Sequence, residues 1–405
     1  MEPNTITLKE LEQFRKETRG TGKKIHFNNA GASLPPDVVV DTVVGYLQEE
    51  ALLGGYETEF KYREQLEHTY QLIARLINAQ PDEIAIVENA STAWGLAFNG
   101  IDFKKDDVII TSEMEYITNL LGFLHAQKKH GVIPEVIPND EYGNFSLQAL
   151  EAAITPKTRL IAITHIASTA GGMTPIAEIG KIARKHGILY LVDACQTVGQ
   201  VPINVDEICC DILAVTGRKY LRAPRGTGFL YVRKQVQDQL NLILMDGYTA
   251  RLTSEHDYEV RNDGRRFELY EKNRALTLGL ARAVEYALNI GVDRTWQRIQ
   301  QLAGSMRKQL RDMAFITVHD SGEQQCGIVT FSVNGIDSGL VKTRLAEKNI
   351  NVSVGRPHST LLYMNKNKLS SIVRASVHYY NTETEIKELC QVLMAIAGHS
   401  VIFTS

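Results

Sequence analysis

The middle of the chain alternates short apolar runs with longer amphipathic segments. The short runs are rich in Ile and Val and read EIAIVE, DVIITS, IPEVIP, RLIAITH, GILYLVD and DILAV. Between most of them lie stretches with helical periodicity, such as EYITNLLGFLHAQKKHG and PIAEIGKIARKHG. Apolar strands separated by helices predict an α/β domain whose mainly parallel sheet is covered by helices on both faces.

Helical patterns come before this region. Thr7-Leu8-Lys9-Glu10 fits a capping box ahead of a short helix. The segment PPDVVVDTVVGYLQEEALLGG predicts a helix that Pro35–Pro36 open and Gly54–Gly55 close. We expect a second, polar-faced helix over residues 58–78.

The pattern changes again beyond about Val260. A polar stretch leads into a long amphipathic helix, NRALTLGLARAVEYALNIG, then a further helix, a strand in GIVTFSVNG and a closing helix after YYNTETE. This order predicts a smaller α+β domain. We therefore divide the chain into an N-terminal arm (1–25) that packs with the small domain, a large domain (26–260) and a small domain (261–405). By composition, residues 250–268 form an exposed loop.

Composition narrows the class of protein. The 405 residues, 44% apolar and 22% charged, suit a soluble globular chain of two domains. A net charge of -3 argues against a general nucleic-acid binder. No apolar run approaches the roughly 20 residues that cross a bilayer, and the N-terminus lacks a secretory pattern, so we expect a cytoplasmic protein. Five scattered cysteines, without CxxC or HExxH, indicate neither a disulfide framework nor a metal site.

Residues that follow the predicted strands carry the chemistry. In open parallel sheets, ligands bind beyond the carboxyl ends of the strands. Asp193 follows one strand, Lys219 another, Ser91 and Thr92 begin a helix after a third, and Tyr116 lies after a fourth. This set suits pyridoxal phosphate, which needs a lysine for a Schiff base and a carboxylate at its ring nitrogen. Hydroxyls at a helix N-terminus can hold its phosphate, and a planar side chain can cover its ring.

Two other ligands fit poorly. The stretch Gly226-Thr227-Gly228 looks like part of a dinucleotide fingerprint, but it leads into the strand FLYV, whereas that fingerprint must open a helix. No GxxxxGK[ST] motif occurs, which argues against a nucleotide-binding P-loop.

These motifs resemble those of class V aminotransferases of pyridoxal-phosphate fold type I, the group that contains cysteine desulfurases, isopenicillin N epimerase and several C–S lyases. The resemblance extends from FNNAG at Phe27 to VRASVHYYNTETE at Val373, and VDACQ followed by TGRK is its most specific part. It implies a large domain with a seven-stranded type of sheet, a smaller α+β domain, and a homodimer with the active site at its interface.

The resemblance also implies roles for individual residues. Lys219 corresponds to the Schiff-base lysine and general base, and Asp193 to the partner of the ring nitrogen. The other cofactor-binding candidates are Ser91, Thr92, Thr216 and Arg218 at the phosphate, Tyr116 over the ring and Gln196 at the ring hydroxyl. Arg374 resembles the arginine that grips the substrate α-carboxylate, for which two parallel N–H groups are suited, and Asn29 and Ser168 are further substrate-binding candidates.

The chain departs from the desulfurase pattern at three places. Arg218 and Tyr116 stand where desulfurases usually carry histidines. SVGRPHSTLLYM (353–364) lacks the cysteine that takes up sulfur as a persulfide. The form TGRKYLRAPRGTGFLYV looks most like the branch that contains hercynylcysteine sulfoxide lyase-type enzymes. We therefore expect β-elimination on an amino acid, with breakage of a C–S bond.

Several alternatives stay open on the sequence alone. Transamination and epimerisation share the early steps of the expected reaction. An inactive binding protein of the same fold would usually have lost Lys219 or Asp193, and both are present. His165 fits a satisfied core histidine as well as a residue that supports the site. Arg222 and Arg225 either bind substrate or pair with surface acids. The resemblance, and not the sequence pattern, makes residues 266–270 candidates for cofactor contacts across a dimer.

Overall fold

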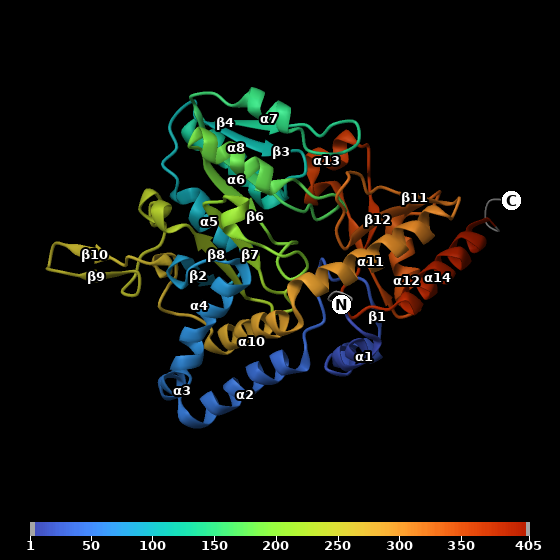
Figure 1. Ribbon diagram of the computed structural model, residues 1–405, viewed down its shortest axis with the longest axis horizontal. Helices are drawn as coiled ribbons and strands as arrows, with labels where there is room; N and C mark the ends of the chain where they lie inside the picture. Colours follow the sequence, from blue (N-terminus) through green and yellow to red (C-terminus); the bar gives the residue numbers. More distant parts are fainter. Residues whose placement is uncertain (1–4, 402–405) are drawn as a thin grey trace.

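A seven-stranded sheet forms the centre of the computed structural model, which describes residues 5–401 (Figure 1). Residues 1–4 and 402–405, part of the predicted arm and small domain, lie outside the described residues. The strand order is β2-β8-β7-β6-β5-β3-β4; β8 is antiparallel to both β2 and β7, and the other neighbouring strands pair in parallel. The strands are β2 (Ile84–Val87), β3 (Val108–Ser112), β4 (Ile133–Ile137), β5 (Thr158–Thr164), β6 (Leu189–Asp193), β7 (Ile212–Thr216) and β8 (Gly228–Val232). The predicted mainly parallel sheet is confirmed.

Apart from the edge strand β4, the strands of this sheet are buried on both faces, which explains why they read as continuous apolar runs. Leu160 and Ala162 of β5 belong to one apolar cluster, whereas Ile161 and Ile163 belong to another, because successive side chains of a strand point to opposite faces. The helices between the strands are α5 (Ala90–Gly100), α6 (Ile117–His130), α7 (Leu147–Ala153), α8 (Ile176–His186) and α9 (Val205–Ile208). Alternating strands and helices thus produce a helix–sheet–helix sandwich.

Three helices that precede the sheet in the chain pack beside it. Helix α2 (Asp37–Leu53) ends at Gly54, whose φ of 97° suits glycine. The single helix predicted over 58–78 is instead two, α3 (Gly55–Lys61) and α4 (Arg63–Ile77). The chain turns at Tyr62, whose ring packs 5.3 Å from that of Tyr46 in α2, and α10 (Arg274–Ile290) lies against both α2 and α4.

The C-terminal part contains a four-stranded antiparallel sheet, in agreement with the predicted α+β character. Its strands, in spatial order, are β11 (Ile316–Val318), β12 (Ile328–Val333), β15 (Ile372–Ser376) and β14 (Ser353–Gly355). Its helices are α11 (Val292–Arg311), α12 (Ser338–Glu347), α13 (Leu361–Lys366) and α14 (Glu383–Val401). A short strand β1 (Ile25–His26) pairs in parallel with β13 (Ile350–Asn351), so the N-terminal segment joins this part of the molecule.

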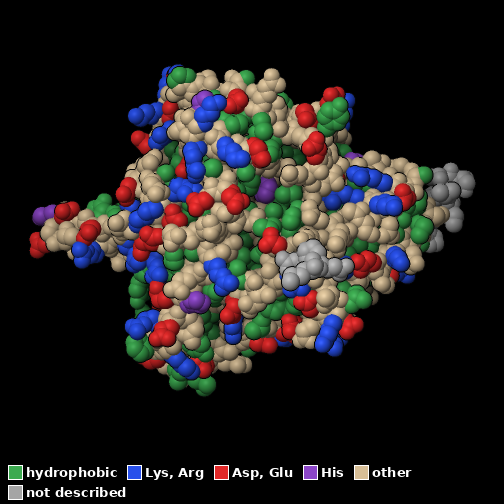
Figure 2. All heavy atoms as spheres, in the orientation of Figure 1, with side chains coloured by type: hydrophobic (Ala, Val, Ile, Leu, Met, Phe, Trp, Pro, Cys, Tyr) green, Lys and Arg blue, Asp and Glu red, His purple; other side chains and the backbone are tan. Residues whose placement is uncertain are grey.

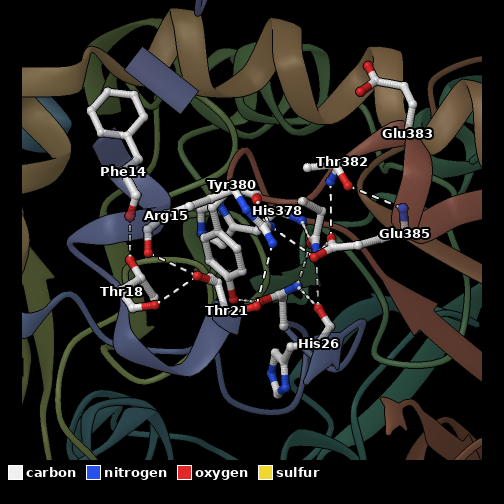
Figure 3. Close-up of polar contacts among 12 residues, drawn as sticks. Phe14, Arg15, Thr18, Thr21, His26, His378, Tyr380, Thr382, Glu383 and Glu385 are labelled. Atoms are coloured by element: carbon white, nitrogen blue, oxygen red, sulfur yellow. Dashed lines mark hydrogen bonds and ion pairs between the residues drawn. The ribbon is translucent and has the colours of Figure 1, made fainter. Parts of the chain in front are cut away.

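Polar contacts hold the N-terminal helix α1 (Leu8–Lys16) to the C-terminal part (Figure 3). Both hydrogen bonds of the Thr7–Glu10 capping box are present, as predicted. Arg15 donates from Nη1 to a carboxylate oxygen of Glu385 and to the carbonyl oxygen of Tyr380, each at 2.8 Å. These contacts support the predicted packing of the arm on the small domain, while the domain bounds themselves stay a prediction.

The segment 250–268 is more ordered than the predicted loop. Its first part forms a hairpin of β9 (Ala250–Leu252) and β10 (Tyr258–Val260), which projects from the rest of the molecule (Figure 1). The prediction of exposure is wrong for its last part, because Gly264, Arg266, Phe267 and Glu268 are buried. Arg251 lies directly opposite Glu259 in this hairpin and forms an ion pair with it, a cross-strand pairing that composition alone does not reveal. On the face in Figure 2, acidic and basic side chains are interspersed. Within residues 5–401, no helix is long and apolar enough to cross a membrane.

Candidate active site

A cavity of about 200 Å³ lies where β5, β6 and β7 end and α5 and α6 begin. It brings together most of the residues that the sequence singled out: Ser91, Tyr116, Ser168, Asp193, Gln196, Thr216, Arg218 and Lys219. The parallel strands deliver these side chains to one edge of the sheet, as the sequence argument required. Thr92, Asn29 and Arg374 are not among the residues that line this cavity.

Lys219 lies on the turn that joins β7 to β8. Its carbonyl oxygen accepts a hydrogen bond from the backbone N–H of Arg222 at 3.0 Å, which closes the turn. Burial lowers the pKa of the Lys219 ammonium below its ordinary value, although the nearby Cys195 and Asp193 oppose this shift. A lower pKa increases the neutral fraction, which is the form of lysine that acts as a nucleophile or base.

Asp193 ends β6 and is 6% exposed. One carboxylate oxygen accepts the backbone N–H of Cys195 at 2.9 Å, and the other accepts the side-chain amide of Asn119 at 3.0 Å. Asn119 lines the cavity too, and the sequence argument missed it. The available signal was its position in the first turn of α6, four residues after Glu115.

The start of α5 forms another wall of the cavity. Its N-cap is Asn89, whose side chain accepts the backbone N–H of Thr92 at 3.0 Å, and not Ser91 or Thr92. That N–H is therefore already bonded, and the phosphate-binding role of Thr92 stays a prediction. The hydroxyls of Ser91 and Thr216 line the cavity beside this helix N-terminus, which carries the positive end of the helix dipole.

Arg218 adds a positive charge to the same wall. Its guanidinium donates to the carbonyl oxygen of Gly31 and makes no ion pair with a carboxylate in the described chain. Burial lowers the pKa of Arg218, as expected for a cation that lacks an acidic partner. The wall formed by Ser91, Thr216 and Arg218 can hold a phosphate.

Arg374 comes from β15 of the small domain. It donates to the carbonyl oxygen of Ser168 at 2.8 Å and to the side-chain oxygen of Asn28 at 3.3 Å. Its Nε is buried without a partner, and it forms no ion pair among the residues described. Burial lowers its pKa to about 10. A buried guanidinium with an unused donor is suited to an incoming carboxylate.

The side chain of Asn29 already makes hydrogen bonds to other residues. Its amide donates to the carbonyl oxygens of Ser376 at 2.7 Å and His26 at 3.1 Å, and the hydroxyl of Tyr380 donates to its oxygen. Its role in substrate binding stays a prediction. The neighbouring Asn28, which the sequence argument did not single out, is the asparagine that contacts Arg374.

Gln196 provides the clearest test of whether the predicted cofactor fits. Its amide nitrogen donates to the carbonyl oxygen of Ala30 at 3.1 Å, but its Oε1 is buried without a partner on the cavity wall. A buried polar atom normally has a hydrogen-bond partner, so this oxygen indicates a missing polar group. The ring hydroxyl of pyridoxal phosphate can supply it. Together with Lys219, Asp193, the half-buried Tyr116 and the hydroxyl-lined helix N-terminus, Gln196 forms a donor set that fits this cofactor.

The structure also settles residues that the sequence left open. His165 is buried and hydrogen-bonded to the Thr197 hydroxyl at 2.9 Å, and burial lowers its pKa to about 3. It is a satisfied, neutral core histidine. Arg222 is buried and donates to Leu34 and Thr18, so it is neither a substrate ligand nor a surface ion pair, whereas Arg225 is exposed.

Residues 266–270 do not line the cavity. Arg266 pairs with Asp238, and the buried Glu268 accepts hydrogen bonds from Tyr70, at 2.9 Å, and from Lys272. Their proposed contacts across a dimer stay a prediction.

Comparison with known proteins agrees with this geometry. The family model described as Aminotransferase class-V matches residues 25–389. A probable cysteine desulfurase of Pyrococcus abyssi is 30% identical over 388 residues, which cover 94% of this chain and 96% of that protein. The apo structure of a cysteine desulfurase from Thermococcus onnurineus NA1 has a TM-score of 0.90 at 28% identity and covers 96% of this chain and 98% of its own. A complex of the cystine C–S lyase C-DES with its product cysteine persulfide shares the fold, with a TM-score of 0.84 at 22% identity over 93% of this chain and 98% of that one.

Proposed function

Because the chain belongs to the class-V aminotransferase family, whose enzymes use pyridoxal phosphate, we propose that it is a lyase that breaks the Cβ–S bond of a cysteine-type amino acid. The reaction is a β-elimination. An S-substituted cysteine and one water give a thiol, pyruvate and ammonia, with no oxidant or reductant required. The observation that carries the proposal is a cavity that joins Lys219 and Asp193, close to an Arg374 whose Nε has no partner, while burial raises the pKa of Cys195, the cysteine that lines this cavity.

Each residue has a distinct part in this reaction. When bound, pyridoxal phosphate withdraws electrons from the substrate Cα. The guanidinium of Arg374 binds the α-carboxylate and so orients the Cα–H bond. Lys219 Nζ takes the α-proton as general base. The carboxylate of Asp193 holds the proton on the ring nitrogen, while Ser91, Thr216 and Arg218 bind the phosphate.

The fate of sulfur distinguishes this proposal from a desulfurase cycle. Segment 353–364 reaches the cavity, since the hydroxyl of Thr360 lies 3.4 Å from that of Ser168, yet the segment contains no cysteine. Cys195 does line the cavity, but burial raises the pKa of its thiol well above the ordinary value. Little thiolate is therefore available to attack a substrate sulfur, and the sulfur departs with the leaving group.

We further propose that the enzyme is a homodimer with its active sites at the interface. Large apolar side chains are exposed along α2 and α3 and on the projecting hairpin: Leu47, Leu52, Leu53, Tyr56, Phe60, Leu252 and Tyr258. Exposed apolar groups of this size, those of α2 and α3 on two helices in contact, favour burial against another protein surface. The amino-acid substrate is then the small-molecule partner, and action in the cytoplasm stays a prediction from the sequence.

The direct test is product analysis of the purified protein loaded with pyridoxal phosphate. With L-cystine and S-substituted L-cysteines as candidates, we expect one of them to yield pyruvate, ammonia and a sulfur product in equal amounts. Lys219→Ala should abolish turnover, because it removes the base, while Lys185→Ala, at an exposed ion pair with Glu151, should retain it. Formation of a different keto acid with amino-form cofactor would indicate transamination, and a D-amino acid would indicate epimerisation. Failure to bind added pyridoxal phosphate would favour the inactive binding protein.

A further inference from the structure

A buried carboxylate that the mechanism above does not use lies next to the cavity. Glu115 is 1% exposed and belongs to the connection between β3 and α6. Its Oε2 accepts the hydroxyl of Thr111 at 2.9 Å. Its Oε1 accepts the backbone N–H of Tyr116 at 2.9 Å, the amide of Asn119 at 2.7 Å, and the hydroxyl of Thr164. Burying a carboxylate is costly unless its hydrogen bonds are made. The donors gathered around Glu115 meet this requirement and indicate that the carboxylate has a role.

Asn119 connects this carboxylate to Asp193. Its Nδ2 donates to Glu115 at 2.7 Å and to Asp193 at 3.0 Å. An amide nitrogen has two N–H groups, and each serves one carboxylate. A flip of the amide would turn its oxygen towards two acceptors, so Glu115 holds Asn119 in one orientation. With Cys195 N–H on the other oxygen of Asp193, both oxygens of that carboxylate are fixed.

The arrangement extends across the sheet and along the helix. Thr164 pairs with Asp193 in the register of β5 and β6, so the hydroxyl that contacts Glu115 comes from the strand next to that of Asp193. The hydrogen bond from the backbone of Tyr116 reaches the same Glu115 oxygen at the start of α6. One side chain thus contacts β3, β5 and α6 at once.

We propose that Glu115 is a positioning residue for the cofactor. Through Asn119 it fixes the carboxylate of Asp193 for the ring nitrogen, and through the backbone of Tyr116 it fixes the start of α6, where Tyr116 lines the cavity. The inference deepens the proposed function and rests on its cofactor site.

The charges of the cluster agree with this role. Burial, with a contribution from the negative charge of Asp193, raises the pKa of the Glu115 carboxyl to about 7, although its hydrogen bonds oppose the shift. Asp193 on β6 is the charged partner in this cluster, whereas Thr111, Asn119 and Thr164 are neutral. A raised pKa is the expected response of a carboxyl that is buried beside a second carboxylate.

The test compares variants of the full chain by how they bind pyridoxal phosphate. Glu115→Ala removes the acceptor for Asn119 and should weaken cofactor binding roughly tenfold, as expected for hydrogen bonds to a charged group. It should also change the visible circular dichroism of the bound cofactor and lower kcat with KM changed less than about twofold. Glu115→Gln keeps an acceptor for Asn119 and should restore most of the affinity. Glu83→Ala, at a buried carboxylate bonded to the backbone of Gln80 and Lys234, should leave cofactor affinity unchanged.

A double-mutant cycle that combines Glu115→Ala with Asn119→Ala tests whether Glu115 acts on Asp193 through Asn119. If Glu115 acts through Asn119, the double variant should bind the cofactor no more weakly than the weaker single variant, and additive losses would overturn the proposal. A folded Glu115→Ala protein with wild-type affinity and circular dichroism would also overturn it, as would a Gln variant as impaired as the Ala variant. Should Glu115→Ala not fold, Asn119→Ala carries the same prediction for affinity. Cofactor binding without lyase products would refute the proposed function alone, because affinity and circular dichroism do not depend on the reaction.

Discussion

His165 shows how a single residue links burial to acid stability. It is neutral in the folded protein, where burial lowers its pKa to about 3, but an unfolded histidine titrates near 6.5. The unfolded state therefore binds more protons between these values, so the stabilising contribution is present above pH 6.5 and is lost as the pH falls. At pH 5 the loss amounts to about 2 kcal/mol of unfolding free energy.

Replacement of this histidine should therefore make the unfolding free energy depend less on pH below neutrality. We expect His165→Asn to reduce the pH dependence of the unfolding free energy between pH 7 and 5 by about 2 kcal/mol, measured by urea denaturation. His125→Asn, at an exposed position of α6, is the control and should leave the slope unchanged. An unaltered slope in His165→Asn would mean that this side chain is already protonated in the folded state.

The residues that sequence reasoning found differ from those it missed in a physical way. Asp193 ends β6, and Lys219 and Ser91 lie within four residues of the ends of β7 and β2, so the rule that ligands bind at strand ends was enough to group them. Glu115, Asn119 and Asn28 are ordinary polar residues until the fold brings Asp193 or Arg374 against them. Their role depends on contacts between residues that are distant along the chain, and a single sequence does not show such contacts.

At the scale of elements, the N-terminus of α5 contributes both to the stability of the fold and to cofactor binding. Asn89 caps this helix and also lines the cavity. Asn89→Ala should cost about 1 kcal/mol of stability through the lost cap, and it should weaken pyridoxal phosphate binding because the first turn of the helix is less well held. Ser146→Ala removes a comparable cap from α7, where Ser146 accepts the N–H of Ala149, away from the residues that line the cavity.

The two cap variants separate the effects. Both should lower the thermal midpoint by similar amounts, whereas only Asn89→Ala should raise the dissociation constant of the cofactor in a fluorescence titration. Equal cofactor affinity in the two variants would show that the α5 terminus does not help to bind the phosphate.

Helices and strands could be predicted where their own sequence pattern determines the structure. All six predicted strand segments occur as strands. Five of them lie inside the sheet or are buried along most of their length, whereas the edge strand β4 is largely exposed and keeps Ile137 buried. At the break near Tyr62, its ring packs against Tyr46 of another helix, and the hairpin of β9 and β10 is formed by backbone pairing across the two strands, with Arg251 opposite Glu259. Both are tertiary or cross-strand contacts that override a local pattern.

At the scale of the whole molecule, the exposed apolar side chains of α2 and α3 predict self-association. Leu52 is 83% exposed, and Phe60 and Tyr56 are each 73% exposed, a costly arrangement for a lone chain in water. We expect the wild-type protein to be a dimer by size-exclusion chromatography with light scattering. Leu52→Glu should shift it towards monomer, because a charge cannot be buried there without a partner.

The matched control places the same change on the small domain. Leu340 of α12 is 43% exposed, and Leu340→Glu should remain dimeric. A monomeric Leu52→Glu protein should lose affinity for pyridoxal phosphate if the partner subunit completes the site. A monomer with wild-type cofactor affinity would confine the site to one chain. A wild-type protein that is already monomeric at micromolar concentration would remove the dimer from the proposal and leave the cavity residues to act alone.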